Sequence, residues 1–358
     1  RLGHDTRVTC LGHVQRGGAP SASDRIQATH VGAEAALAIL KADDTTPSRV
    51  VGIRFGIPVQ IGLTLAVKIT QDLGQALLDK KFESAIQRRG LLFRQSFQSY
   101  MEIRHNNKVP QNGHNILLFH GGSPASGMNT VAKTMVRTLV NSGHRVFGAT
   151  DGFLGLAQGH VTELFWNDVS QWSGLGGCKL GTNRVQPDRI NGTEGISRIA
   201  TALKGFNIHG LVCIGGFEAF RGIHKLCSFR DHFPALCIPM TVVPVTISNN
   251  ISGTEFCVGS DTALNAIVES IDRLKVAASS SRARLFIVEV MGGYCGHLAI
   301  MGALAGVTSV CLSTTSVYLS AKSVCLSTTS VCLSTTFVCL SATSVCLSAT
   351  SVCLSATS

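Results

Sequence analysis

The apolar run LCIPMTVVPV, residues 236–245, is followed directly by the polar cluster TISNN, residues 246–250. The run predicts a buried strand, and the cluster falls where that strand would end and open into a loop. Ligands of α/β sheets bind outside the carboxyl ends of the strands. Residues 246–250 are therefore the first candidate for a binding site.

Two other stretches repeat this arrangement of an apolar strand and a loop of small or polar residues. One is 211–214 followed by GGFEA at 215–219, and the other is 285–290 followed by MGGYCG at 291–296. Parallel strands end at the same edge of a sheet, so three such junctions predict one shared crevice.

The stretch 114–306 alternates predicted strands with predicted helices. It begins with an apolar strand at 115–119, a glycine-rich loop at 121–129, a helix at 130–140 and a second strand at 144–149. This alternation is typical of an α/β fold with a largely parallel sheet. The glycine-rich loop either binds an anion at the start of the following helix or is only a tight turn, and the sequence leaves both interpretations open.

The composition favours a small anionic ligand over nucleic acid or membrane. The 358 residues are long enough for two domains, and the formal net charge is +10. The chain has no Lys- or Arg-rich run and is only 6% aromatic, which argues against nucleic acid. Its longest apolar run, 298–307, is half the length that a membrane span needs. Phosphorylated metabolites are the class of ligand that fits best, because single arginines stand beside the glycine-rich junctions.

The 13 cysteines show no metal-ligand spacing. Seven of them lie in the first 300 residues, mostly inside apolar stretches, which indicates free thiols in a reducing compartment. We therefore expect no metal site and a cytoplasmic location.

The first 113 residues predict a smaller set of elements: a strand at 5–12, helices at 26–40 and 63–78, a strand at 50–53 between them, and a polar linker at 91–113. Three basic residues near the first strand, Arg7, His13 and Arg16, either converge on one anion or belong to a structural turn with solvated side chains. Their spacing does not decide between the two.

The last fifty residues repeat the unit Ser-Val-Cys-Leu-Ser-Thr/Ala-Thr with small variations. An odd period puts the apolar residues of successive repeats on opposite faces of a strand, and consecutive Val, Cys and Leu do not match a coiled coil. We expect a low-complexity tail, disordered or prone to aggregation, rather than a regular element.

Four motifs together resemble animal ATP-dependent 6-phosphofructokinase. They are LGHVQRGG at 11–18, GGFEA at 215–219, TISNN at 246–250 and MGGYCG at 291–296. The resemblance runs from Arg1 to about Gly306 and implies three-layer α/β lobes. It divides the chain into the end of an N-terminal catalytic half (1–90), a linker (91–113), an incomplete C-terminal regulatory half (114–306) and the repeat tail (307–358). The front of the catalytic half, with its ATP loop and catalytic aspartates, is expected to precede Arg1.

The resemblance also implies ligands and residue roles. The complete family enzyme uses ATP and Mg²⁺ to phosphorylate fructose 6-phosphate to fructose 1,6-bisphosphate, and assembles as a tetramer. Arg7, His13 and Arg16 match contacts to fructose 6-phosphate. The matches to contacts of the allosteric ligand fructose 2,6-bisphosphate are Arg184, Thr246, Ile247, Ser248, Asn249, Asn250, Arg284, Met291, Gly292 and Gly293.

The chain departs from the catalytic pattern at two positions. Phe217 and Ser248 stand where the family's catalytic half has a metal-binding aspartate and a base. A phenyl ring cannot hold Mg²⁺ and a serine hydroxyl is not basic near neutral pH. We therefore expect no catalytic residue, no metal and no cofactor in this chain alone. Three hypotheses remain: a piece of a 6-phosphofructokinase, a non-catalytic fragment that binds fructose 2,6-bisphosphate, and a truncated product without function.

Overall fold

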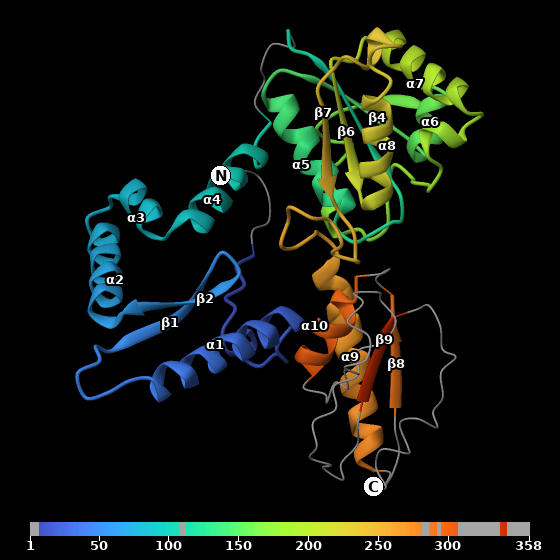
Figure 1. Ribbon diagram of the computed structural model, residues 1–358. Coiled ribbons are helices and arrows are strands. Elements are labelled where there is room, and N and C mark those ends of the chain that lie inside the picture. Colours follow the sequence, from blue (N-terminus) through green and yellow to red (C-terminus); the bar gives the residue numbers. More distant parts are fainter. Residues whose placement is uncertain (1–6, 107–111, 281–285, 292–294, 307–336, 342–358) are drawn as a thin grey trace, which may run out of the picture.

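The computed structural model describes residues 7–106, 112–280, 286–291, 295–306 and 337–341, and its largest body is built on a five-stranded sheet (Figure 1). The strands are β3 (Asn115–Gly121), β4 (Arg145–Ala149), β5 (Val161–Leu164), β6 (Gly210–Gly215) and β7 (Met240–Pro244), in the order β5-β4-β3-β6-β7. All neighbours are parallel except β5, which runs antiparallel to β4. The predicted α/β fold with a largely parallel sheet is confirmed.

Both faces of this sheet are covered, because its central strands are apolar on both sides. Alternate residues of β3 enter different cores: Leu117 and Phe119 face one, and Leu118 faces the other. The first core is closed by α6 (Gly152–Ala157), α7 (Thr193–Gly205) and α8 (Phe217–Cys227). The second is closed by α5 (Met128–Asn141) and the segment around η2 (Trp172–Gly174). The result is a three-layer lobe, which also contains the short turns η3 (Pro187–Arg189) and η4 (Pro234–Leu236).

A second, smaller body follows the sheet. It contains α9 (Ser260–Ser279), β8 (Phe286–Val290), α10 (His297–Gly306) and β9 (Phe337–Ser341), with β8 and β9 paired in parallel. Its core includes Leu264 and Val268 of α9 together with Leu298 of α10. Ile247, from the loop after β7, packs against this core and so connects it to the sheet.

The first hundred residues extend away from the sheet in Figure 1. They form η1 (His13–Arg16), α1 (Ala22–Leu40), the hairpin of β1 (Arg49–Arg54) and β2 (Ile57–Gly62), and then α2 (Leu63–Leu78), α3 (Phe82–Arg88) and α4 (Leu91–Ile103). The hairpin turns at Phe55 and Gly56, whose φ angles are 51° and 76°. Two consecutive positive φ angles are those of the tight turn that matches strand twist.

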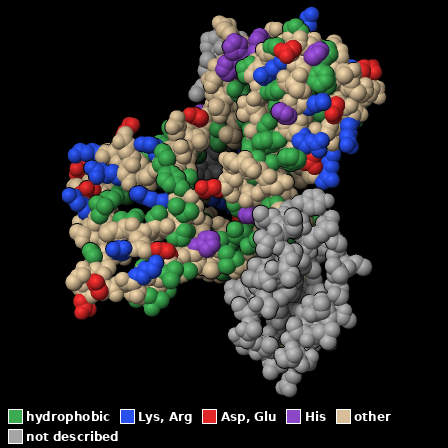
Figure 2. Space-filling view, in the orientation of Figure 1, with side chains coloured by type: hydrophobic (Ala, Val, Ile, Leu, Met, Phe, Trp, Pro, Cys, Tyr) green, Lys and Arg blue, Asp and Glu red, His purple; other side chains and the backbone are tan. Residues whose placement is uncertain are grey.

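The surface of the first hundred residues carries apolar side chains among its lysines and arginines (Figure 2). Leu78 of α2 and Leu92 of α4 are each 79% exposed. None of the helices in the described ranges is both long and apolar enough to cross a membrane.

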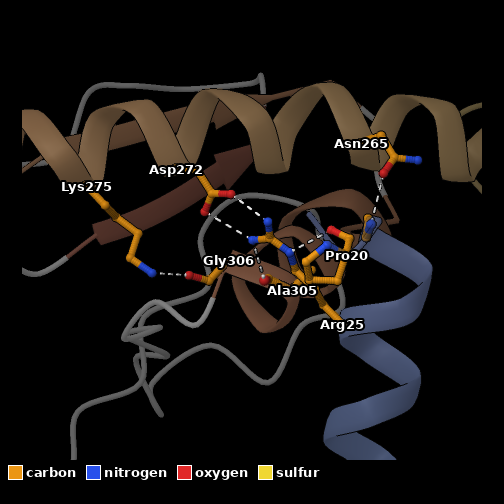
Figure 3. Close-up of polar contacts among 8 residues, drawn as sticks. Pro20, Arg25, Asn265, Asp272, Lys275, Ala305 and Gly306 are labelled. Carbon is orange, nitrogen blue, oxygen red and sulfur yellow. Dashed lines mark hydrogen bonds and ion pairs between the residues drawn. The ribbon is translucent and has the colours of Figure 1, made fainter. Parts of the chain in front are cut away.

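A polar cluster fastens the start of α1 to the smaller body (Figure 3). The guanidinium of Arg25 donates from Nη2 to Oδ2 of Asp272 at 2.7 Å and from Nη1 to Oδ1 at 3.1 Å. The backbone N–H of Ala22 donates to Oδ1 of Asn265 on α9 at 2.9 Å. We call these four residues the α1–α9 clamp. Ala22 is fully buried, so apolar packing supports the clamp.

Two predicted strands were wrong in detail. Residues 7–12 contain no strand, so the predicted strand at 5–12 fails in its described part. The role of 91–113 as a linker stays a prediction, and its first part forms a regular helix, α4. The strand predicted at 236–245 is shorter, because Pro234 and Leu236 belong to η4 and pairing with β6 begins at Met240. β7 is also an edge strand, and none of its five residues is fully buried.

The tail prediction is contradicted at one place. Residues Phe337–Ser341 form β9, although the repeat predicted no regular element. A five-residue strand needs only its own backbone groups and a partner, and β8 supplies the partner. The rest of 307–358 lies outside the described residues.

Candidate functional site

The turns that follow β6 and β7 lie side by side at the carboxyl edge of the sheet. The N–H of Val245 donates to the carbonyl of Gly215 at 3.1 Å. A Cβ atom placed on Gly216 would lie 3.2 Å from Oγ1 of Thr246, so a side chain at this position would press on the polar loop. The small residue therefore allows the two turns to approach closely.

A segment without regular structure, 180–184, crosses the same edge and closes on the ends of β3 and β4. The N–H of Asp151 donates to the carbonyl of Leu180 at 2.9 Å. The N–H of Gly122 donates to the carbonyl of Asn183 at 2.9 Å, and Oγ1 of Thr182 donates to the carbonyl of Gly122 at 2.8 Å. These hydrogen bonds fix the backbone that carries Arg184.

Arg184 places a cation at this edge. Its Nε donates to Oγ of Ser123 at 2.8 Å, and Nη2 also contacts that hydroxyl. Oε1 of Glu218 lies 3.9 Å from Nε, and the Arg184 side chain is 69% exposed. A planar guanidinium that is held on one side and open on the other is suited to bind a phosphate group.

The loop at 246–250 is shaped by Asn249, which has a φ of 50°. Asparagine tolerates this left-handed conformation better than most residues. Its Oδ1 accepts from the N–H of Cys257 at 2.7 Å and its Nδ2 donates to the carbonyl of Glu255 at 3.0 Å. The N–H of Ser248 donates to Oγ1 of Thr246 at 3.3 Å. The loop is thus ordered by its own side chains.

The third junction reaches the same loop from the smaller body. The thiol of Cys295 donates to the carbonyl of Ser248 at 2.9 Å. The ring of His297 places Nδ1 3.3 Å from Nδ2 of Asn249. Burial lowers the pKa of His297, so its imidazole is neutral near pH 7. The structure therefore brings the end of the third junction, at Cys295, against the loop at 246–250, but β8 pairs with β9 in a separate sheet and does not share the edge of β6 and β7.

Only some of the residues predicted to contact fructose 2,6-bisphosphate from the third junction lie in the described part of the chain. Met291 is described and 67% exposed, whereas Arg284, Gly292 and Gly293 lie outside the described residues. Asn250 is exposed next to the half-buried Asn249.

The basic residues of the N-terminal part lie on an exposed segment. His13 and Arg16 share the single turn η1, and Arg7 precedes it in exposed chain without regular structure. Convergence of the three on one anion stays a prediction.

The two positions of interest for catalysis carry no basic or metal-binding group. Phe217 begins α8 with its side chain 53% exposed, and Ser248 is half-buried in the loop. Within the part of the chain that the structure describes, no group of three or more His, Cys, Asp or Glu side chains could hold a metal ion.

The glycine-rich loop after β3 is covered by protein. Met128 and Asn129, the first residues of α5, are fully buried. A Cβ atom on Gly127, whose φ is 97°, would collide with the side chain of Val258. Of the two interpretations of this loop, the packing favours the tight turn, and Ser123 is its contribution to the exposed edge.

Sequence reasoning missed the buried polar residues behind this edge. Asn129 donates to the carbonyl of Leu175 at 3.0 Å and accepts from the N–H of Lys179 at 2.7 Å, which anchors the segment that leads to Arg184. Burial lowers the pKa of His120 to about 4 and raises the pKa of Cys178 to about 12. These two side chains contact each other and are uncharged at neutral pH, so they support the segment without offering a reactive thiolate. No local sequence pattern marks them.

A cavity of about 430 Å³ lies elsewhere, between α7 and η4, with Lys204, Asn207 and Phe233 among its lining residues. Ile208 and Ile238, which precede β6 and β7, also line it, so it opens near the amino ends of these strands. It is separate from the edge that carries Arg184 and residues 246–250.

The fold and this edge define an α/β protein whose strand ends gather around an exposed arginine. The family model described as Phosphofructokinase matches residues 1–39 and 115–332. The chain therefore belongs to the phosphofructokinase family. Residues 40–114 lie between the matched ranges, and the second range extends past Gly306.

Sequence similarity to two phosphofructokinases supports this assignment. The chain is 44% identical over 307 residues to the platelet-type ATP-dependent 6-phosphofructokinase of Rattus norvegicus, covering 85% of this chain and 38% of the relative. It is 46% identical over 307 residues to the liver-type enzyme of the same organism, covering 85% of this chain and 39% of the relative. The chain thus spans about two fifths of the length of these relatives.

Two solved structures have the same fold. A phosphofructokinase from Pichia pastoris in the T-state superposes with a TM-score of 0.81 at 37% identity, covering 86% of this chain and 35% of that chain. A phosphofructokinase from Saccharomyces cerevisiae gives a TM-score of 0.82 at 39% identity, covering 87% of this chain and 41% of that chain. The predicted family and fold are confirmed.

Proposed function

We propose that the carboxyl edge of the five-stranded sheet is a non-catalytic binding site for a sugar bisphosphate, with fructose 2,6-bisphosphate as the ligand. The observation that carries this proposal is the position of Arg184. It is hydrogen-bonded to Ser123 and open to solvent, and the Glu218 carboxylate that lies 3.9 Å from its Nε also lies next to Gly216, which contacts Thr246. The cation and the polar loop supply the two kinds of contact that a sugar phosphate needs.

Binding without chemistry fits the same residues. Phosphoryl transfer needs a metal clamp and a group that orients or deprotonates the attacking hydroxyl. Phe217 and Ser248 supply neither. We infer that Thr246, Ile247, Ser248, Asn249 and Asn250 hold the ligand, with Arg284, Met291, Gly292 and Gly293 completing the site from the third junction.

The names of the relatives also favour a catalytic role for a protein of their full length that contains such a chain. We propose that this protein transfers the γ-phosphoryl group of ATP, with Mg²⁺, to fructose 6-phosphate in glycolysis, as a cytoplasmic tetramer. Arg7, His13 and Arg16 would contact the substrate. Residues 1–90 would belong to its catalytic half, 91–113 to the connection and 114–306 to its regulatory half.

Thermal unfolding of the full 358-residue chain with fructose 2,6-bisphosphate tests the site. A ligand that binds only the native state stabilises it by about 2.7 kcal/mol at a concentration of 100 Kd. For a chain of this size that corresponds to a rise in Tm of roughly 3–5 °C. A chain that shows no cooperative transition at all would be a truncated product without function.

Two variants make the test specific. Arg184→Gln should remove most of the rise in Tm, because it removes the charged partner of the phosphate. Arg198→Gln is the matched control, since Arg198 is an exposed arginine of α7 that pairs with Glu194 within its own helix. Equal ligand-induced shifts in wild type and Arg184→Gln would show that the phosphate binds elsewhere.

A further inference from the structure

The carboxylate of Glu218 lies over the two glycine turns of the candidate site. Glu218 is the second residue of α8, which begins directly after Gly216. A Cβ atom on Gly122 would lie 3.1 Å from Oε2 of Glu218, and one on Gly216 would lie 3.7 Å from the same atom. Glycine at both positions leaves the space that the carboxylate fills.

This carboxylate is held in the position that a ligand would share. Oε1 lies 3.9 Å from Nε of Arg184, and the Glu218 side chain is 37% exposed. Its place in the first turn of α8 also sets it where a helix favours negative charge. The backbone is fixed as well, because Nε2 of Gln186 donates to the carbonyl of Glu218 at 3.2 Å.

A carboxylate at this point has opposite effects on two kinds of ligand. It repels a bare anion that approaches Arg184, because the two negative charges would lie within a few ångströms of each other. An ionised carboxylate has only acceptors, so its natural partner is a hydroxyl that donates. A phosphate ester of a polyol brings both a phosphate for Arg184 and hydroxyls for Glu218. Pyrophosphate brings only charge.

We propose that Glu218 is the specificity-determining residue of this site, accepting a hydrogen bond from a ligand hydroxyl and rejecting phosphates that lack one. This inference rests on the proposed function and adds the residue that selects within it. Discrimination of this kind combines an attractive contact for one ligand with repulsion of the other.

The test compares two probes on the full chain, fructose 2,6-bisphosphate and inorganic pyrophosphate, by isothermal titration calorimetry at pH 7.5. Glu218→Gln keeps the shape of the side chain and removes its charge. It should weaken the sugar bisphosphate about fivefold and tighten pyrophosphate about fivefold, as expected for one charged contact near solvent. The control Glu194→Gln changes another glutamate in the first turn of a helix, which also pairs with an arginine, and it should change neither affinity.

The two proposals fail differently. If wild type binds neither probe, the site itself is refuted and the role of Glu218 with it. If wild type binds the sugar bisphosphate but Glu218→Gln tightens both probes equally, Glu218 is only a nearby charge and the specificity proposal alone is overturned. Unchanged affinities in Glu218→Gln would overturn it as well.

Discussion

Breaking the α1–α9 clamp should release α1 from the smaller body. The perturbation is a double-mutant cycle of Arg25→Met, which keeps most of the side-chain stem, and Asp272→Asn, which keeps the shape. Each variant of the cycle is made in the full chain. The coupling energy is the difference between the change in unfolding free energy of the double mutant and the sum of the changes of the two single mutants.

The geometry sets the magnitude. The pair is bidentate, at 2.7 Å and 3.1 Å, and the Arg25 side chain is only 20% exposed, whereas Asp272 is 41% exposed. Exposed ion pairs contribute about 0.2–1 kcal/mol, and hydrogen bonds to charged groups about 1.5–3 kcal/mol. Because water reaches Asp272, we expect a coupling energy of about 1–2 kcal/mol. Arg25→Met alone should cost about 2–3 kcal/mol, since it also removes donors to the carbonyls of Pro20 and Ala305.

Hydrogen exchange of the α1 amides is the decisive assay, because a chain with several bodies need not unfold in a single step. Arg25→Met should lower the protection of α1 far more than that of β3 and β6. These measurements should be made at pH 7. The hydrogen bond from Arg25 holds the pKa of Asp272 below its ordinary 3.8. The ion pair therefore contributes its full stabilisation above pH 3.8 and loses it as the pH falls through the lowered pKa.

The matched control is the pair of Glu194 and Arg198, which is also a carboxylate with an arginine but is at least half exposed on both sides and lies within one helix. Its cycle should give about 0.3–0.5 kcal/mol. A coupling energy for Arg25 and Asp272 no larger than this, or unchanged exchange of α1, would show that apolar packing alone holds α1 in place.

Two further predictions concern the three-layer lobe. Gly222→Ala should destabilise the lobe by roughly 1–3 kcal/mol in urea unfolding, because the new methyl would lie 2.2 Å from Cζ of the buried Phe153. The control is Gly205→Ala, whose new methyl would have no atom within 4 Å and which should be neutral or slightly stabilising. Burial lowers the pKa of His120 from 6.5 to about 4, so as the pH falls the unfolded chain binds this proton before the folded chain does. The free energy of unfolding of the lobe should therefore fall by up to about 3 kcal/mol between pH 6.5 and pH 4. His120→Asn should flatten this part of the pH dependence in urea unfolding, and an unchanged slope would refute the assignment.

The strands of the central sheet were predictable because they are both short and apolar. Predicted strands at 115–119, 144–149 and 211–214 correspond to β3, β4 and β6, which lie in the middle of the sheet and need apolar residues on both faces. β7 was harder to delimit because Pro239 and Pro244 lie within its apolar run, and an edge strand needs less burial.

The helix α4 was missed although its sequence contains a signal. Phe93, Phe97 and Met101 recur at intervals of four residues, the spacing of one helix face. No described residue of α4 is fully buried, and the polar residues between the aromatics hid the period. β9 had no comparable signal, since its partner β8 is about fifty residues away and the repeat around it is uniform.

Part of the candidate site could be predicted from local sequence patterns, and part depends on contacts between residues far apart in the chain. Thr246 and Gly216 could be placed at one edge from the sequence, because each follows a predicted strand and strands of one sheet end together. The same reasoning was wrong for Met291, because β8 pairs with β9 in a separate sheet. Arg184 follows no strand. Its position depends on the hydrogen bonds of Asn129 and Thr182 to backbone that lies about fifty to sixty residues away in the chain. Only the resemblance could name Arg184 in advance, because contacts over such separations leave no periodic trace in the residues that make them.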